Sequence, residues 1–316
     1  MQMPTTVRQW PELPPESKGP YARLKERLGR PRARRLLRLT ALLLLVALVL
    51  TGGLVVLLFV TRTYRLDSAT YPGTVRRLAV DADNGEVDAV GSDRRDVLAL
   101  WQKRYSLIEP RVDRAVQDGT LGLRSHCPVL SFRCYVVLGS QVPAATAVSV
   151  HTRSASVSVQ DLRAPVDVTT GSGAVSLEGI VAAVRVATGS GAVSLGGLRG
   201  ELAASTVSAP IELRDVGGRA RVSSDSGTIT GNAQLLQTLV ARTGSGWVTA
   251  AFNAPPERVE IRSASGEISL EVPAGRYRLD LHAPAGRVHV QGVVNDPAAT
   301  RTISITTGAG IEVSAA

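Results

Sequence analysis

Apolar and polar residues alternate with a period of two along most of the chain beyond residue 145, and this alternation itself repeats every eighteen residues. Aliphatic residues hold that spacing in three separate columns. The columns are Val157, Val175, Val193, Ile211 and Ile229; Val150, Val168, Val186, Ala204 and Val222; and Leu162, Ile180, Leu198 and Val216. A period of two predicts β-strands, and the longer period predicts a repeat unit of two short strands.

The two strands of each repeat are separated by a turn built from the smallest residues, as in the Gly-Ser-Gly of residues 171–173 and again of residues 189–191. Because glycine adopts positive φ without strain, its fixed place predicts a left-handed backbone conformation in these turns. The turn glycines are Gly171, Gly173, Gly189, Gly191, Gly227, Gly244, Gly246, Gly266, Gly286, Gly308 and Gly310.

Two all-β architectures fit such a repeat. In a β-solenoid, two-strand rungs stack on one another and bury like side chains in ladders. In a meander of antiparallel hairpins, the same short glycine loops would join neighbouring strands of one sheet. Three columns with one constant spacing favour the solenoid, with a repeat of about 18 to 20 residues over residues 146–316.

Residues 77–145 are less regular. Residues 77–90 have the pattern of a first rung with its turn at Asn84-Gly85, after which the period is lost. Residues 96–107 predict a strand with a large apolar face. We expect it to cap the first rung, because the end of a solenoid otherwise exposes its core and unpaired strand edges.

The other end of the repeat region has no evident cap. The chain finishes at residues 311–316 with an alternating strand pattern. An uncovered last strand can pair with another molecule, so we expect it to support homo-oligomerisation.

Residues 39–60 form an uncharged apolar segment of 22 residues. As an α-helix it would reach about 33 Å, enough to cross a hydrocarbon core of about 30 Å, so we predict a transmembrane helix. A cleaved signal peptide is the alternative. The apolar run is longer than such peptides use, and residues 61–67 lack a small-x-small cleavage pattern, which favours an uncleaved anchor followed by a linker at residues 61–76.

The net charge of +9 is concentrated before this segment. Residues 1–38 hold ten basic and three acidic residues and several prolines, and predict a disordered cytoplasmic tail. The basic residues that flank the membrane are Arg30, Arg32, Arg34, Arg35 and Arg38. Their position predicts contact with the bilayer and its anionic lipid rather than with nucleic acid, and it places residues 61–316 outside the bacterial cytoplasmic membrane.

The chain has two cysteines, Cys127 and Cys134. On the external side of a membrane, two cysteines seven residues apart predict a disulfide that joins the end of one strand to the next strand. Together with His126 they would supply three metal ligands without a fourth nearby in sequence, so we do not expect a metal site.

The run from Cys127-Pro128 to Cys134, the Val-Pro-Ala-Ala of residues 142–145 and the Thr-Gly-Ser-Gly-Ala-Val-Ser-Leu repeats resemble the β-strand-repeat family of unknown function known as "putative adhesins", in its membrane-anchored actinobacterial type. The resemblance covers residues 77–316. The commonest repeat of that family has an acid after the Gly-Ser-Gly turn, where this chain has Ala174 and Ala192. The family implies no catalytic residues.

Motifs of enzyme chemistry are absent from the sequence. The glycine turns lack the third glycine and the helix of a dinucleotide site, and neither a phosphate-binding Gly-x-x-x-x-Gly-Lys loop nor a Gly-x-Ser-x-Gly nucleophile elbow occurs. The four histidines form no His-Glu-x-x-His motif, and the acids between Asp81 and Asp88 do not have the spacing of an EF-hand loop. We therefore expect no enzymatic activity and no cofactor.

These observations predict a single-pass membrane protein whose external β-repeat domain has an adhesin-like role, binding or organising material at the bacterial cell envelope. Cell-wall polymer, glycan and envelope protein are the candidate partners. The alternative is envelope-stress sensing, in which the chain is a scaffold or regulatory subunit that acts through a protein partner.

Overall fold

The computed structural model describes residues 31–60, 63–106, 108–128, 134–233 and 235–316. The chain divides into two compact units, Met1–Val60 and Thr61–Ala316, each of which is described by itself.

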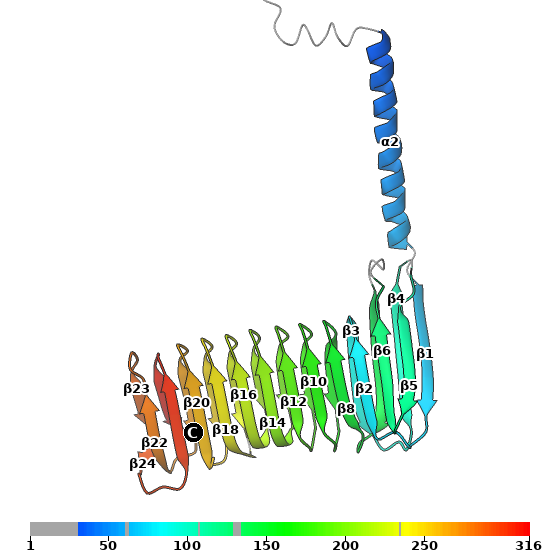
Figure 1. Cartoon of the computed structure of the whole chain (residues 1–316). Coiled ribbons are helices and arrows are strands. Elements are labelled where there is room, and N and C mark those ends of the chain that lie inside the picture. Colours follow the sequence, from blue (N-terminus) through cyan, green and yellow to red (C-terminus); the bar gives the residue numbers. More distant parts are fainter. Residues whose placement is uncertain (1–30, 61–62, 107, 129–133, 234) are drawn as a thin grey trace, which may run out of the picture. The chain divides into compact units, whose positions relative to one another are not determined.

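The described part of the first unit is a single helix, α2 (Pro31–Val60) (Figure 1). Its stretch from Arg38 to Val56 is long and apolar enough to cross a membrane. Of the membrane-flanking arginines, Arg30 lies outside the described residues, whereas Arg32, Arg34, Arg35 and Arg38 belong to α2. The prediction of a disordered tail up to residue 38 was therefore wrong for residues 31–38. Proline is well suited to the first helical turn and arginine has a high helix propensity, so the helix begins before the apolar segment does.

The second unit is all-β and consists of two sheets, each of 13 strands among the described residues. Sheet A contains, in spatial order, β1 (Thr63–Tyr71), β4 (Val97–Tyr105), β7 (Tyr135–Pro143), β3 (Gly85–Ser92), β9 (Ser156–Gln160), β11 (Val175–Glu178), β13 (Val193–Gly196), β15 (Ile211–Arg214), β17 (Ile229–Ala233), β19 (Val248–Phe252), β21 (Ile268–Val272), β26 (Ile311–Ala315) and β23 (Val288–Gln291).

Sheet B contains, in the reverse direction along the stack, β24 (Val294–Asn295), β22 (Arg276–His282), β25 (Thr302–Thr307), β20 (Arg258–Ser263), β18 (Leu235–Thr243), β16 (Gly217–Ser224), β14 (Arg199–Thr206), β12 (Val184–Thr188), β10 (Val166–Thr170), β8 (Ala147–Thr152), β2 (Arg77–Ala82), β6 (Thr120–His126) and β5 (Arg111–Gln117).

The two strands of a repeat belong to different sheets, and equivalent strands of successive repeats pair in parallel. Val175 of β11 lies between Val157 and Val193, its counterparts eighteen residues before and after it. In sheet B, Val168 lies between Val150 and Val186 in the same way. The stack of rungs in Figure 1 is the predicted β-solenoid, and the antiparallel meander is excluded.

The three sequence columns form the core of this stack. Val168 and Val186 point inward from sheet B and Val175 and Val193 from sheet A, and each side chain is nearly or fully buried. The third column, which includes Ile180, lies in the turn that leads from sheet A back to sheet B, where its side chains are also buried. Burying an aliphatic side chain of this size contributes about 1.5–3 kcal/mol, so the ladders are the main source of stability.

The glycine turn at the other end of each rung is held by a buried hydroxyl group. Thr188 accepts a hydrogen bond from the backbone N–H of Gly191, and the same bond is made one and two rungs away. The hydroxyl column comprises Thr152, Thr170, Thr188, Thr206, Ser224, Thr243, Ser263 and Thr307, all buried. These hydroxyl groups satisfy backbone N–H groups that would otherwise be buried without a partner.

The predicted positive φ of the turn glycines was wrong. None of Gly171, Gly173, Gly189 and Gly191 has φ in the left-handed region. Glycine is required there by close stacking, because a Cβ on Gly191 would overlap the carbonyl oxygen of Gly173 in the rung before. Positive φ occurs instead in the opposite turn, in a column with the same eighteen-residue spacing that contains Asp161, Gly179, Gly197 and Asp215.

The first end of the stack is more elaborate than the sequence suggested. Residues 77–92 do form a rung, β2 and β3, but a second rung made of β6 and β7 lies outside it. Strands β1, β4 and β5 then cover this outer rung in antiparallel pairing. The segment expected to cap the first rung is β4, and it covers β7 instead. The outer rung went unnoticed because its residues are not eighteen positions from those of its neighbour.

The last strand of the chain is not an edge strand, contrary to the prediction. β26 pairs with β21 on one side and with β23 on the other, because the chain forms the terminal rung first and then inserts β25 and β26 one position further in. The uncovered sheet edges at this end belong to β23 and β24. The expected homo-oligomerisation therefore loses the basis that residues 311–316 had given it.

Cys127 and Cys134 form a disulfide, with their Cα atoms 5.7 Å apart. It joins the end of β6 to the start of β7, as predicted, and so closes the turn of the outer rung. The neighbouring rung is tied to this turn by two hydrogen bonds, from the Cys127 N–H to an Asp83 carboxylate oxygen and from the Asn84 amide to the Cys134 carbonyl.

The stacking contact at the glycine turn predicts the effect of a small substitution. Gly191→Ala is expected to lower the free energy of unfolding by about 1–3 kcal/mol, because the added methyl group must displace the neighbouring turn. The exposed neighbour Ser190 provides the control, since Ser190→Ala removes only a surface hydroxyl and should change stability by less than about 0.5 kcal/mol. Urea unfolding followed by circular dichroism measures both. Equal stability of the two variants would contradict the close-stacking explanation.

A candidate binding groove on sheet B

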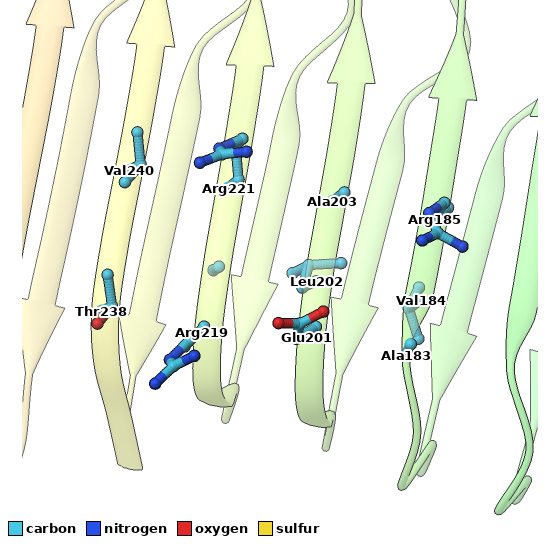
Figure 2. Close-up of a pocket in the computed structure, with 11 residues that line it drawn as sticks. Ala183, Val184, Arg185, Glu201, Leu202, Ala203, Arg219, Arg221, Thr238 and Val240 are labelled. Atoms are coloured by element: carbon cyan, nitrogen blue, oxygen red, sulfur yellow. The ribbon is translucent and has the colours of Figure 1, made fainter.

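The outer face of sheet B is hollowed where β12, β14, β16 and β18 lie side by side (Figure 2). The hollow has a volume of about 450 Å³. A second hollow of about 300 Å³ adjoins it and shares Arg185, Ala203 and Arg221 with it. Together they form one open groove across successive rungs, which we call the arginine groove.

The groove exists because side chains of different size occupy one row of the sheet. Arg185 on β12, Ala203 on β14 and Arg221 on β16 are register partners and all point outward, as do alternate residues along each strand. The backbone of the rungs is nearly constant, so a methyl group between two arginines leaves a depression. Figure 2 shows Ala203 between the two guanidinium groups, with Arg219 further along β16.

The arginines of the groove are not neutralised by neighbouring acids. Arg185, Arg219 and Arg221 are exposed, and within the described ranges no carboxylate oxygen lies within 4.0 Å of their nitrogens. Two acids line the groove without forming ion pairs: Glu201, the register partner of Arg219, and Asp167, the register partner of Arg185. Three unpaired guanidinium groups around one hollow favour the binding of anions.

A cluster on the neighbouring rungs shows the opposite arrangement. Glu260 on β20 is largely buried and accepts a hydrogen bond of 2.8 Å from Arg258, while Arg262 and Arg242 lie 3.2 and 3.5 Å from it. The hydrogen bond from Arg258 and the charges of the three arginines hold the pKa of the Glu260 carboxyl below its usual value, against the effect of burial. These arginines are engaged in structure, whereas those of the groove are free to bind a ligand.

The residues selected from the sequence lie elsewhere. The turn glycines lie along one side of the solenoid where sheets A and B meet, and the disulfide lies in the outer rung at the first end. Thr170, one of the hydroxyl residues expected on the surface for weak polar contacts, is buried in the turn, where it accepts a hydrogen bond from Gly173. None of these residues lines the groove.

The acids of the first rung are engaged with neighbouring basic groups. Asp81 pairs with Arg124 at 3.0 Å, and Asp83 pairs with His126 at 2.8 Å. A search of the described residues finds no group of three or more histidine, cysteine, aspartate or glutamate side chains that could hold a metal ion.

The arginine groove was missed in the sequence although its signal was present. Arg185 and Arg221 are separated by two repeats of eighteen residues, and Ala203 stands midway between them. Once strands are assigned, the period alone places these three residues in one outward row. The analysis followed the apolar columns and not the polar ones, and so it did not find this row.

Comparison with known proteins agrees with the observed fold. The family described as Toastrack DUF4097 matches residues 72–310. No curated protein shows a significant match to the chain.

Several solved structures are also similar. A "putative adhesin" from Bacteroides fragilis is 14% identical with a TM-score of 0.39, and the match covers 80% of this chain and 97% of that one. A "putative lipid binding protein" from Parabacteroides distasonis is 14% identical with a TM-score of 0.43, with coverage of 80% and 97%. A "putative cell adhesion protein" from Clostridium sporogenes is 10% identical with a TM-score of 0.23, with coverage of 81% and 100%.

The ion cluster around Glu260 predicts a pH-dependent contribution to stability. Glu260→Gln is expected to lower the free energy of unfolding by about 1–2 kcal/mol at neutral pH, because the Gln side chain cannot pair with three arginines. The pKa of Glu260 is lower in the folded than in the unfolded chain. The stabilisation is therefore complete above the unfolded-state pKa, about 4.3, and is lost as the pH falls through the folded-state value.

Urea unfolding of the native chain and the variant between pH 7 and pH 3 tests this dependence. The difference in unfolding free energy should be constant down to about pH 5.5 and should shrink below about pH 4. Glu212→Gln is the control, because Glu212 is exposed and lies 3.7 Å from a single arginine, Arg214. A difference that persists unchanged at pH 3 would show that the effect of Glu260→Gln is steric rather than electrostatic.

Proposed function

The chain belongs to the Toastrack DUF4097 family, and on that premise we propose that it is a membrane-anchored protein whose β-solenoid binds a component of the bacterial cell envelope. The observation that carries the proposal is the arginine groove: three unneutralised guanidinium groups around a hollow on a rigid sheet. A stack of packed rungs holds such groups in fixed positions, as a binding surface requires. We assign the chain a binding role rather than an enzymatic one.

Helix α2 supports the anchoring part of the proposal. Its side chains from Leu39 to Val56 are exposed and almost all apolar. The hydroxyl of Thr51, one of its few polar groups, donates a hydrogen bond of 2.8 Å to the carbonyl of Ala47 within the same helix. A helix that is apolar on all sides and satisfies its polar groups internally is stable in a bilayer.

The proposed orientation rests on the basic residues before the apolar stretch and on the disulfide beyond it. Arginines on the N-terminal side of a membrane helix favour retention of that side in the cytoplasm, where they can also contact anionic lipid. The Cys127–Cys134 disulfide in the second unit fits an oxidising compartment outside the cytoplasmic membrane. The solenoid would then face the cell wall and the other envelope polymers.

The anchoring and orientation can be tested on cells that produce the full-length chain with a different epitope at each end. After removal of the cell wall and treatment with protease, the C-terminal epitope should be lost and the N-terminal epitope should remain protected. Protection of the C-terminal epitope would overturn the orientation. Release of a chain that lacks the N-terminal epitope into the medium would show that residues 39–60 belong to a cleaved signal peptide.

Binding can be tested with the detergent-purified full-length chain and isolated cell-wall sacculi, which remain intact in detergent. The chain is expected to sediment with the sacculi both before and after these are treated with protease and the protease is inactivated. Binding that is lost after protease treatment would identify an envelope protein as the partner and favour the scaffold or regulatory alternative. A chain that remains in the supernatant in both cases would overturn the proposed function.

A further inference from the structure

We propose that the arginine groove binds a linear anionic polymer without bases, such as a polyol or glycan chain with phosphate or carboxylate groups. The inference rests on the proposed function and specifies the ligand of the same site. Arg185 and Arg221 would each bind one anionic group, and the polymer backbone would lie in the hollow over Ala203.

The spacing of the arginines suits a polymer better than a single small anion. Arg185 and Arg221 occupy one row and are separated by one intervening strand, β14. Neighbouring strands are about 4.8 Å apart, so their backbones are about 10 Å apart. One phosphate is too small to bridge that distance in bidentate contact with both, whereas successive charged groups of an extended chain can occupy both positions at once.

The shape of the groove provides room for a chain between the charges. Ala203 is exposed in the floor, and the adjoining part of the groove is floored by Ala187 and Ser205, which are also small. Guanidinium groups present a rigid fork of donors that matches phosphate and carboxylate oxygens. Glu201 lies at one side of the groove and would repel an anion there, which leaves the row through Arg185, Ala203 and Arg221 as the favoured path.

The lining favours a polymer without bases over a single-stranded nucleic acid. Proteins that bind single strands combine basic residues with aromatic side chains on which the bases stack. The residues that line both hollows include no aromatic side chain. They also include no exposed large apolar residue that could insert into a bilayer, and the charged groups surround a depression rather than project from the face, so a membrane surface fits less well.

The test uses the full-length chain in nanodiscs of phosphatidylcholine, which carry no net charge. Binding is measured by biolayer interferometry to poly(glycerol phosphate), polygalacturonate and dextran, and to oligothymidylate and phosphatidylglycerol vesicles. The two anionic polymers without bases should bind, and dextran should not. Stronger binding of oligothymidylate would assign the groove to nucleic acid, and binding of the vesicles alone would assign it to lipid headgroups; either result overturns the inference.

Two groove variants separate charge from shape. Arg185→Gln with Arg221→Gln should weaken binding of the anionic polymers at least tenfold and should reduce the slope of log affinity against log salt by about 2. Ala203→Phe keeps all three charges but fills the floor, and it should also weaken binding. The matched control is Arg153→Gln with Arg214→Gln, which removes two exposed arginines outside the groove and should leave binding unchanged.

The outcomes also separate this inference from the proposed function. If both groove variants bind the polymers as well as the native chain does, the groove is not the site. If the groove variants still sediment with protease-treated sacculi, the chain binds the wall through another surface, so the proposed function stands and the ligand assignment fails. If the native chain binds the polymers but not the sacculi, the groove binds anions as inferred and the proposed envelope role fails.

Discussion

The close approach of successive glycine turns sets the geometry on which the rest of the solenoid depends. Where Gly191 stacks on Gly173, no side chain fits between the two backbones, and the buried hydroxyl of Thr188 supplies the hydrogen bond that the turn needs. Because each rung repeats this arrangement, the parallel strands on both sides of the turn fall into register at a constant spacing. The valine ladders of the core then follow, since equivalent side chains are placed directly above one another.

A constant backbone has a direct consequence for function. When every rung has nearly the same course, the relief and the charge of the outer faces depend only on which side chains occupy each outward row. One row of sheet B passes from Arg185 through Ala203 to Arg221 and forms an open basic groove. Further along the same sheet, Glu260 draws three arginines together and leaves no free charge there. The fold thus provides a rigid frame, and binding properties arise from local substitutions.

The ends of the stack follow a different logic, because a solenoid has no repeat to cover its last rung. At the first end, antiparallel strands β1, β4 and β5 cover the outer rung. At the other end the chain builds the terminal rung from β22 and β23 and then returns to insert β25 and β26 inside it. In both regions the rungs are out of sequence order, so the eighteen-residue period no longer tells which strands are neighbours.

The sequence by itself determined the repeat, the strands, the parallel stack, the apolar helix and the cysteine pairing, because each depends on local spacing or on the period of one column. Only the tertiary structure decided why the turns need glycine, where the rung of β6 and β7 lies, and how the last strand is covered. These depend on which backbones meet across long separations in the chain. The arginine groove lies between the two cases: the period places Arg185, Ala203 and Arg221 in one row, but only the packed sheet shows that no acid neutralises the arginines and that the row is hollow.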